Sequence, residues 1–169
     1  MKQIKIINLE NVSEDEVSKY SVREAARAIV FDDNKLVALL HATKNHYYKL
    51  PGGGIEKGEN NEEALKRECR EEIGCDVEIV EDLGLIVEYR KKFKVKQTSY
   101  CYIAKLVGEK GVPNLEPDEI EEGFETVWLS FEDAMNKVKE SETLNYASPY
   151  MISRDLAFFE AAKEILRSV

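Results

Sequence analysis

Three consecutive glycines, Gly52 to Gly54, constrain this chain more than any other feature of its sequence. Glycine loses more backbone freedom on folding than any other residue, so we expect this run to form a loop and neither a helix nor a strand. A helix is predicted after it, because Asn60 is a favourable N-cap and Glu63 completes the reciprocal capping pattern. Gly74 then supplies a typical C-terminal stop for that helix.

The predicted helix carries three glutamates on one face. Glu68, Glu71 and Glu72 stand at positions i, i+3 and i+4, which share a face of an α-helix. At about 100° per residue, Glu72 lies roughly 20° from the apolar position Leu65, and Glu68 lies roughly 60° from it. At least two carboxylates therefore border the stripe that we expect to be buried, which consists of Ala64, Leu65, Cys69 and Ile73.

Such a cluster of like charges is unfavourable unless a cation neutralises it. Each like-charge pair at this spacing costs about 0.2–0.5 kcal/mol even on an exposed helix, and partial burial raises the carboxylate pKa values. A divalent cation removes that cost, and magnesium prefers carboxylate, water and phosphate oxygens as ligands. Because a glycine backbone can also approach a ligand closely, the loop and the helix together predict a magnesium site that binds phosphates.

A second interpretation is a solvated helix face whose charges form ion pairs. Arg67 and Arg70 are available for this, and Glu63 stands four residues before Arg67, the favourable order for such a pair. This interpretation explains the helix but not the three glycines in front of it. We therefore favour the metal site.

The rest of the chain predicts a mixed sheet between helices. Residues 23–31 and 35–41, separated by turn residues at 32–34, are typical of a hairpin. This element order differs from the regular alternation of a doubly wound parallel sheet, so we expect an α+β fold, an α-β-α sandwich, built as a single domain over 1–169. Further strands are predicted at 47–50, 77–80, 83–89, 98–107 and 127–129, an exposed loop at 108–123, and helices at 131–138 and from Ser148 onward.

Composition and charge narrow the environment and the partners. No apolar run is long enough to cross a bilayer, and the N-terminus lacks the apolar core of a signal peptide, so we expect a cytoplasmic protein. The formal charge of −9 argues against a broad basic face for a nucleic acid polymer or a membrane. Three cysteines, Cys69, Cys75 and Cys101, are interpreted as reduced and buried.

The segment from Gly53 to Cys75 resembles the Nudix box, the signature of the MutT-like Nudix hydrolases. Cys69 and Cys75 depart from the box, which has bulky aliphatic residues there, but both are small and hydrophobic, so we expect the packing to survive. Similar features on both sides extend the resemblance over residues 22–138. Every fixed charged or glycine position of the box, over 53–75, is filled: Gly53, Glu59, Arg67, Glu68, Glu71, Glu72 and Gly74.

The resemblance implies a role for each of these residues in a metal-dependent hydrolase. Arg67 would pair with Glu59 and hold the turn between loop and helix, so both belong to the expected catalytic set. The metal, Mg²⁺ or alternatively Mn²⁺, would activate a water that attacks phosphorus, and its ligands would be Glu68, Glu71, Glu72 and a backbone carbonyl near Gly53. Substrate contacts are expected from a strand arginine, from the lysine before the loop and from the loop itself: Arg27, Lys49, Gly53 and Gly54.

The general base and the residues that bind the nucleoside stay open. Glu68 is one candidate base, and in related enzymes a loop glutamate takes that role instead. The histidines, His41 and His46, have no partner that indicates catalysis. The predicted loop at 108–123 offers four glutamates, most of which we interpret as solvated charges: Glu116, Glu119, Glu121 and Glu122. Three aromatic residues are candidates to stack on a base, although strand aromatics more often belong to a core: Tyr47, Tyr48 and Phe93.

The expected substrate is a small nucleotide that contains a diphosphate bond. Nudix hydrolases of the ADP-ribose type carry a proline shortly after the box, and none occurs here from 74 to 112. We therefore favour a nucleoside triphosphate or a dinucleoside polyphosphate, with ADP-ribose or a nucleotide sugar as the alternative. A non-catalytic nucleotide sensor is a third hypothesis, disfavoured because that class usually lacks box carboxylates that this chain retains. The last helix leaves a homodimer open.

Overall fold

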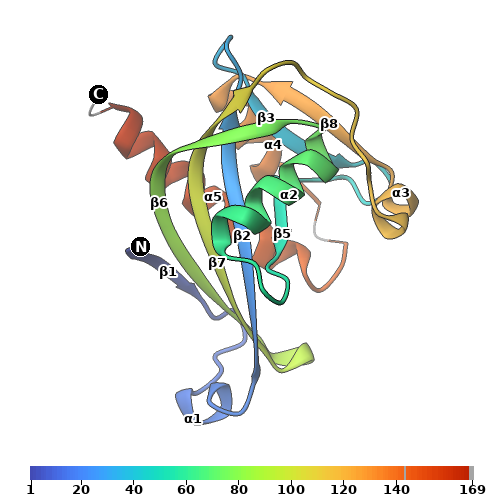
Figure 1. Cartoon of the computed structure of the whole chain (residues 1–169). Helices are drawn as coiled ribbons and strands as arrows, with labels where there is room; N and C mark the ends of the chain where they lie inside the picture. The colour runs from blue at the N-terminus through green and yellow to red at the C-terminus, as the bar shows by residue number, and fades with distance from the viewer. Residues whose placement is uncertain (143, 168–169) are drawn as a thin grey trace.

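The computed structural model describes residues 1–142 and 144–167, and its strands form a mixed sheet between helices (Figure 1). Along the chain the elements are β1 (Gln3–Ile7), α1 (Glu14–Val17), β2 (Ser21–Phe31), β3 (Val37–Ala42), β4 (Tyr47–Lys49), β5 (Gly52–Gly54), α2 (Asn61–Ile73), β6 (Asp76–Arg90), η1 (Lys91–Phe93), β7 (Val95–Val107), α3 (Pro117–Glu122), β8 (Phe124–Leu129), α4 (Phe131–Lys139) and α5 (Ser148–Arg167).

The sheet separates two hydrophobic cores. In the described part of the chain its strands are joined in the order β1-β6-β7-β2-β3-β4, while β5 pairs with β2 and β8 pairs with β3. The pairs β1–β6 and β2–β7 are parallel, and the other pairs are antiparallel. α2 packs on one face, and α4 and α5 cover the other. The predicted α-β-α sandwich with a mixed sheet is therefore confirmed.

The helix predicted after the glycines is α2, and both of its ends form as capping rules require. The Asn60 side chain accepts a hydrogen bond of 3.0 Å from the backbone N–H of Glu63, whose side chain accepts one of 2.9 Å from the N–H of Asn60. Gly74 ends the helix in the left-handed conformation, with φ 65°. The buried face contains the four predicted apolar residues and, in addition, Glu72.

The glycine run is a strand, so the prediction of a loop is wrong. Gly52 to Gly54 form β5, which pairs with residues 25–27 of β2. Glycine is needed here because β5 lies very close to its neighbour: a Cβ on Gly52 would lie 2.1 Å from the carbonyl oxygen of Ala26. Gly52 also has φ +123°, which side chains rarely allow. Hydrogen bonding to β2 outweighs the low strand propensity of glycine.

The predicted hairpin is present as the antiparallel pair of β2 and β3, but it is short, because most of β2 pairs with other strands. β2 pairs with β3 only at Phe31 and Val37, whereas it pairs with β7 over its full length. Residues 25–30 of β2 are all buried, so both faces of the strand are covered. The backbone groups along its two edges therefore need partners, which β7 and β5 supply. The turn itself is present, because the Asp32 carboxylate accepts hydrogen bonds from the N–H groups of Asn34 and Leu36.

Two other predictions need smaller corrections. The segment predicted as an exposed loop at 108–123 contains α3, which begins with Pro117 and ends at Gly123. The two strands predicted at 77–80 and 83–89 are one strand, β6, with irregularities between residues 79 and 84. β1 and α1 are additional elements that no sequence pattern predicted. No helix within 1–142 and 144–167 combines the length and apolarity that a membrane span requires.

A buried carboxylate, Asp155, joins α5 to the segment that precedes the glycines. Arg154 is 1% exposed and Asp155 is fully buried, and Arg154 Nε donates to Asp155 Oδ1 over 2.7 Å. Asp155 Oδ2 accepts a 2.9 Å hydrogen bond from the N–H of Leu50. Glu88 on β6 extends the network, with 3.7 Å between its Oε1 and Arg154 Nη1. One carboxylate thus joins α5 to the chain that enters β5.

We expect Asp155→Ala to destabilise the protein by about 3–5 kcal/mol, because it leaves the N–H of Leu50 buried without its partner and the guanidinium of Arg154 with only the more distant Glu88. Denaturant unfolding followed by circular dichroism measures this loss. Glu160→Ala, at an exposed position of the same helix, is the matched control. A loss below about 1 kcal/mol, the ordinary size for a point mutation, would contradict the structural role given to Asp155.

Candidate active site

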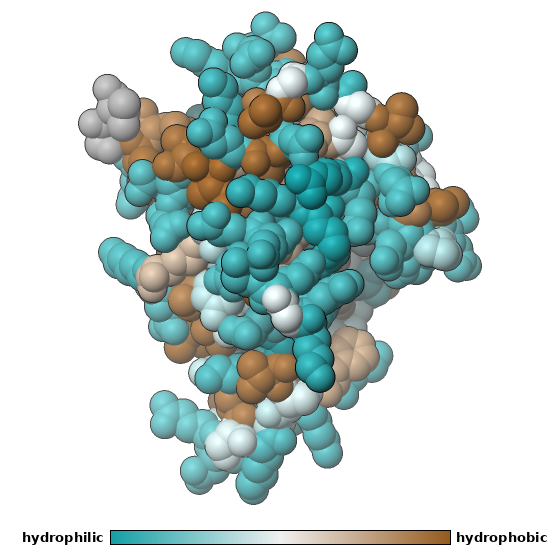
Figure 2. Space-filling model, viewed as in Figure 1, coloured by the Kyte–Doolittle hydropathy of each residue, from teal (hydrophilic) through white to brown (hydrophobic). Residues whose placement is uncertain are grey.

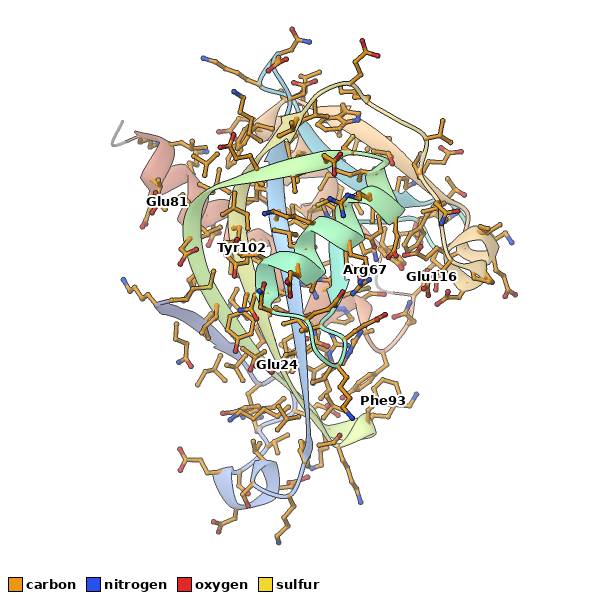
Figure 3. All side chains as sticks on the ribbon, viewed as in Figure 1. Glu24, Arg67, Glu81, Phe93, Tyr102 and Glu116 are labelled. Atoms are coloured by element: carbon orange, nitrogen blue, oxygen red, sulfur yellow. The ribbon has the colours of Figure 1, made fainter. Side chains whose placement is uncertain are left out.

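A cavity of about 390 Å³ lies between α2, β5 and α3. Figure 3 shows Arg67 on α2 and Glu116 next to α3 on the same side of the molecule, and Figure 2 shows that hydrophilic residues predominate on the surface over α2. Acidic side chains outnumber basic ones in the lining by eight to four. The charged lining residues are Glu56, Glu68, Glu71, Glu72, Glu116, Asp118, Glu119, Glu122, Arg23, Arg27, Lys49 and Arg67.

The three glutamates predicted to share a face of α2 all reach this cavity, and their burial follows the helical spacing. Glu72 is 1% exposed, as expected for the position nearest the apolar stripe. The side chains of Glu68 and Glu71 are 13% and 30% exposed. Burial, and secondly the negative charge of Glu72, raises the pKa of Glu68. The helix therefore places its carboxylates where their charges are only partly neutralised.

Arg67 connects the loop before α2 to the carboxylates on it. Its Nε donates to Glu59 Oε1 over 2.7 Å, and its Nη1 donates to Glu68 and Glu71 over 2.9 and 3.0 Å. Its Nη2 donates to the carbonyl oxygen of Gly54 over 2.9 Å. The bond to Glu59, together with that to Glu68, raises the pKa of Arg67. The pairing of Arg67 with Glu59 that the resemblance implied is present.

Glu72 connects α2 to the strands on either side of Pro51. Its Oε1 lies 2.9 Å from Lys49 Nζ, and its Oε2 accepts a 2.5 Å hydrogen bond from the N–H of Gly52. The Lys49 ammonium also lies 4.6 Å from the centroid of the Phe124 ring. Lys49, expected to contact a substrate, thus lines the cavity but is engaged by an ion pair.

Gly53 allows the carboxylate of Glu68 to approach β5. A Cβ on Gly53 would lie 2.3 Å from Glu68 Oε1, so any larger residue would push this carboxylate away. The second glycine of the run therefore makes room for a candidate metal ligand. The prediction that glycine brings backbone close to the acidic cluster agrees with this geometry, although the backbone is a strand.

Two arginines on β2, Arg23 and Arg27, line the same cavity, and we call them its basic wall. Arg27 is buried, donates to the carbonyl oxygen of Gly52 and leaves its Nε without a hydrogen-bond partner. Burial lowers the pKa of Arg27 to about 10, so it remains charged at neutral pH. Arg23 was not predicted, although it lies at an even spacing from Arg27 and hence on the same face of the strand. Its guanidinium lies 3.6 Å from the position of a Cβ on Gly54 and donates to Gln97 over 2.9 Å.

The glutamates of α3 lie closer to the cavity than solvated charges would. Glu116, Glu119 and Glu122 line it, whereas Glu121 does not. Burial, and to a smaller extent the charge of Glu72, raises the pKa of Glu119 to about 7. The interpretation as solvated charges therefore fails for Glu119 and Glu122, which are half-buried, and holds for Glu121.

The other candidate side chains have structural partners. Tyr47 donates to Glu122 over 2.7 Å and packs edge-on against Phe124, so it belongs to the cavity wall. Tyr48 stacks on His41 with 4.2 Å between the ring centroids. Burial lowers the pKa of His41. Phe93 is 54% exposed and does not line the cavity.

The donor set of the cavity suits a hard divalent cation. Three carboxylates and the backbone of β5 offer oxygen ligands, and the helix carries unneutralised negative charge. Over residues 1–142 and 144–167, however, no three His, Cys, Asp or Glu side chains converge closely enough to hold a metal ion. The ion pairs to Arg67 and Lys49 draw the carboxylates in different directions. The types of residue present fit a divalent cation, but in the described residues they are not arranged as a preformed metal site.

Comparison with known proteins identifies the family. The family model of the NUDIX domain matches residues 22–150. The RNA pyrophosphohydrolase of a Nitratiruptor species is 36% identical over 92 residues, which are 51% of this chain and 59% of that protein. The RNA pyrophosphohydrolase of a Sulfurovum species is 33% identical over 100 residues, 54% of this chain and 63% of that protein. The chain belongs to the Nudix hydrolase family, and it spans less than two thirds of the length of these relatives.

Solved structures support the fold. A NUDIX hydrolase from Nitrosomonas europaea superposes with a TM-score of 0.64 at 16% identity, covering 85% of this chain and 90% of that one. The MutT protein from Methanosarcina mazei Go1 gives a TM-score of 0.60 at 20% identity, covering 86% and 96%. At these identities the likeness concerns the architecture alone.

We expect the three cysteines to resist alkylation in the folded protein. All are buried, and burial raises the pKa of each thiol, so the reactive thiolate is scarce near neutral pH. Mass spectrometry after iodoacetamide treatment should find no adduct in native buffer and three adducts in guanidinium chloride. Rapid labelling of Cys69, Cys75 or Cys101 in the native protein would contradict this placement.

The pairing of Glu59 with Arg67 predicts a pH-dependent contribution to stability. The hydrogen bond from Arg67 lowers the pKa of Glu59 from 4.5 to about 2. A lowered folded-state pKa means that the stabilisation is present above the unfolded value and is lost as pH falls toward the folded value. The unfolding free energy of the wild type should therefore exceed that of Glu59→Gln above about pH 5, and the gap should close toward about pH 2.

Denaturant titrations in EDTA at several pH values measure this gap. Glu164→Gln is the matched control, because Glu164 is an exposed carboxylate of α5 whose replacement should give no such trend. A gap between the wild type and Glu59→Gln that stays constant on acidification would show that the carboxylate does not depend on Arg67.

Proposed function

We propose that the protein hydrolyses a diphosphate bond in a nucleoside triphosphate or a dinucleoside polyphosphate with the help of Mg²⁺ or Mn²⁺. One observation carries this proposal: three clustered carboxylates of α2 and two arginines of β2 line one cavity. The acidic wall suits a divalent cation, and the basic wall suits phosphate oxygens. A substrate whose phosphates bind the cation on one side and the arginines on the other satisfies both walls.

The residues that would hold the metal are Glu68, Glu71, Glu72 and the backbone of Gly53. When bound, the metal supplies neutralisation of phosphate charge and a water of lowered pKa. Arg67 acts on these ligands indirectly, because its bonds to Glu59 and to Gly54 fix the direction from which it reaches Glu68 and Glu71. The Nudix-box residues Glu59 and Arg67 are therefore proposed as positioning residues.

The basic wall is proposed to bind and orient the phosphates. Arg27 has a free Nε, and neither Arg27 nor Arg23 forms an ion pair with a carboxylate in the described part of the chain. A guanidinium without an acidic partner is suited to bind a phosphate in two-point contact. Gly54 lies next to Arg23, so a phosphate bound by Arg23 would lie close to β5.

Two residues are candidates to accept the proton of the attacking water. Glu68 belongs to the acidic wall and has a raised pKa. Glu119 reaches the cavity from α3, and its pKa is raised as well. Glu119 is held in place by the N–H of Glu116, whose hydrogen bond to its carboxylate measures 2.9 Å. Both carboxylates face the cavity, so single substitutions separate their roles.

The triphosphorylated end of an RNA is a second candidate substrate. The relatives from Nitratiruptor and Sulfurovum are named RNA pyrophosphohydrolases. This candidate runs against the expectation of a small nucleotide without a polymer. The reaction on phosphorus is the same in both cases, and the candidates differ in what lies beyond the phosphates.

We expect Glu68→Gln and Glu72→Gln each to lower kcat/KM by more than about 100-fold. Residues that only hydrogen-bond to metal ligands contribute about 10- to 100-fold, and these two glutamates are proposed as the ligands themselves. The assay measures release of phosphate or pyrophosphate from nucleoside triphosphates, dinucleoside polyphosphates, ADP-ribose and triphosphorylated RNA, with Mg²⁺, with Mn²⁺ and with EDTA. Glu62→Gln, on the exposed side of α2, is the matched control. Turnover that persists in EDTA, or in folded Glu68→Gln protein, would refute the proposal.

A further inference from the structure

The turn between β6 and β7 forms a basic tip on an acidic protein. Figure 1 shows these strands and β2 extending below α2 to the turn at η1. Residues 90–96 contain four lysines, one arginine and no acidic residue, whereas the whole chain has a net charge of −9. Arg90 is buried and paired with Glu88, so the exposed charge of this turn comes from its lysines. We call residues 90–96, together with Tyr146, the basic tip. The aromatic side chain within the turn, Phe93, is 54% exposed.

The basic tip combines an aromatic platform with a cation. The rings of Phe93 and Tyr146 are perpendicular, with 5.1 Å between their centroids. The Lys92 ammonium lies 5.7 Å from the Phe93 centroid and 5.5 Å from that of Tyr146. The N–H of Lys92 donates to the Tyr146 hydroxyl over 3.1 Å, which fixes the turn against the segment before α5. The platform is therefore held in place by the fold.

The nearby carboxylates do not neutralise this part of the tip. Glu10 accepts hydrogen bonds from Tyr146 and from the N–H of Lys91. Glu16 on α1 lies 4.0 Å from the Lys91 ammonium. Within the described residues, neither Lys92 nor Lys94 has a carboxylate partner. The positive charge beside Phe93 is thus available to an external anion.

The basic tip is continuous with the basic wall of the cavity. In the β2–β7 pair Arg23 lies opposite Gln97 and Ser21 lies opposite Val95. Val95, the tip residue on the same strand face as Gln97, is thus two residues, or about 7 Å, along the strand from the residue opposite Arg23. Arg23 lines the cavity and donates to Gln97. Figure 3 shows Phe93 below Arg67 and Glu116 in this view. A ligand that leaves the cavity past Arg23 reaches Lys92 and Phe93.

We propose that the basic tip binds the nucleotides that follow the phosphates of a single-stranded RNA whose 5′ end lies in the cavity. Cationic side chains that track a phosphate backbone, with an aromatic ring on which a base stacks, are the features by which proteins bind single strands. This inference rests on the second candidate substrate, the triphosphorylated end of an RNA. It assigns the strand a path from the basic wall over Arg23 to the exposed ring of Phe93.

An extended anionic surface, such as a membrane, fits the basic tip less well. α1 packs beside the tip and carries Glu14, Asp15 and Glu16 in its first turn. A flat anionic surface that touched the lysines would also meet these carboxylates, which repel it. A single strand on the Phe93 side contacts the lysines without meeting α1. The charge distribution therefore favours a narrow polyanion.

The test measures binding of a fluorescent single-stranded RNA of about ten nucleotides with a 5′-hydroxyl, in EDTA, by anisotropy. This probe has no group for the metal and cannot be turned over, so the result does not depend on the proposed hydrolysis. We expect Phe93→Ala to weaken binding at least about fivefold, the lower end of what one base stack contributes. The double variant Lys92→Gln/Lys94→Gln should reduce the slope of log K against log salt by about 0.7 for each phosphate that it no longer neutralises.

The matched control is Lys105→Gln/Lys139→Gln, which removes two exposed lysines outside the tip. Circular dichroism verifies that each variant folds. In a second readout, the ratio of kcat/KM for triphosphorylated RNA to kcat/KM for the mononucleotide triphosphate should fall in the tip variants and not in the control. If no substrate is turned over but the tip variants still weaken RNA binding, the hydrolase proposal fails and this inference stands.

Three results would overturn the inference. The first is a wild-type protein that does not bind the RNA, and the second is equal binding by the tip variants and the control. The third is binding to vesicles that contain phosphatidylserine, abolished in Lys92→Gln/Lys94→Gln, without binding to RNA. That third outcome would assign the basic tip to a membrane surface.

Discussion

The rest of the structure depends on the burial of one carboxylate, that of Glu72, between α2 and the glycine strand. An ionised carboxylate that leaves water without partners costs several kcal/mol. Here one oxygen meets the Lys49 ammonium and the other the N–H of Gly52, so the charge is compensated by groups on both sides of Pro51. Because Gly52 lies directly against Ala26 of β2, the same contact sets how deeply α2 sits on the sheet. One side chain therefore contacts both the helix and the strand that line the cavity.

Arg67 binds the carboxylates at the more exposed edge of the helix. A guanidinium offers five donors in one plane, and this one serves Glu59, two glutamates of α2 and the carbonyl oxygen of Gly54. A lysine, with a single ammonium, could not bridge acceptors in such different directions. The arrangement keeps Glu68 and Glu71 in the cavity while leaving its acidic wall incompletely neutralised. An acidic protein can in this way hold a cation and, through it, an acidic ligand.

Sequence reasoning succeeded where structure is decided within a few residues. The caps of α2, its apolar stripe and the shared face of its glutamates follow from the geometry of one helix, and all are observed. It failed where a partner distant in sequence decides the outcome. The three glycines become a strand only because β2 is available to pair with them, and β2 is central only because β7, more than 70 residues later, runs beside it. No local pattern in residues 52–54 or 23–31 contains that information.

The residues of the candidate site also fall into those that the local sequence predicts and those that depend on the fold. Its acidic wall and Arg27 could be predicted from the Nudix box and from the strand pattern at 23–31. Arg23, and the choice of Glu119 and Glu122 among the glutamates at 116–122, required the fold. α3 did carry a local signal, since Pro117 at the start and Gly123 at the end are ordinary helix boundaries, but the acidic composition of 108–123 suggested a loop.

The two helices that line the cavity, α2 and α3, differ in how firmly they are fixed. α2 is a thirteen-residue helix whose stripe is buried against the sheet, so its glutamates are held by tertiary packing. α3 has six residues and buries none of them, and a helix that short has little stability of its own. Its position depends on contacts such as the Tyr47–Glu122 hydrogen bond and that between Thr43 and Gly123. The width of the cavity, and hence the size of substrate it admits, is therefore set by the α3 wall, while the chemistry is set by α2.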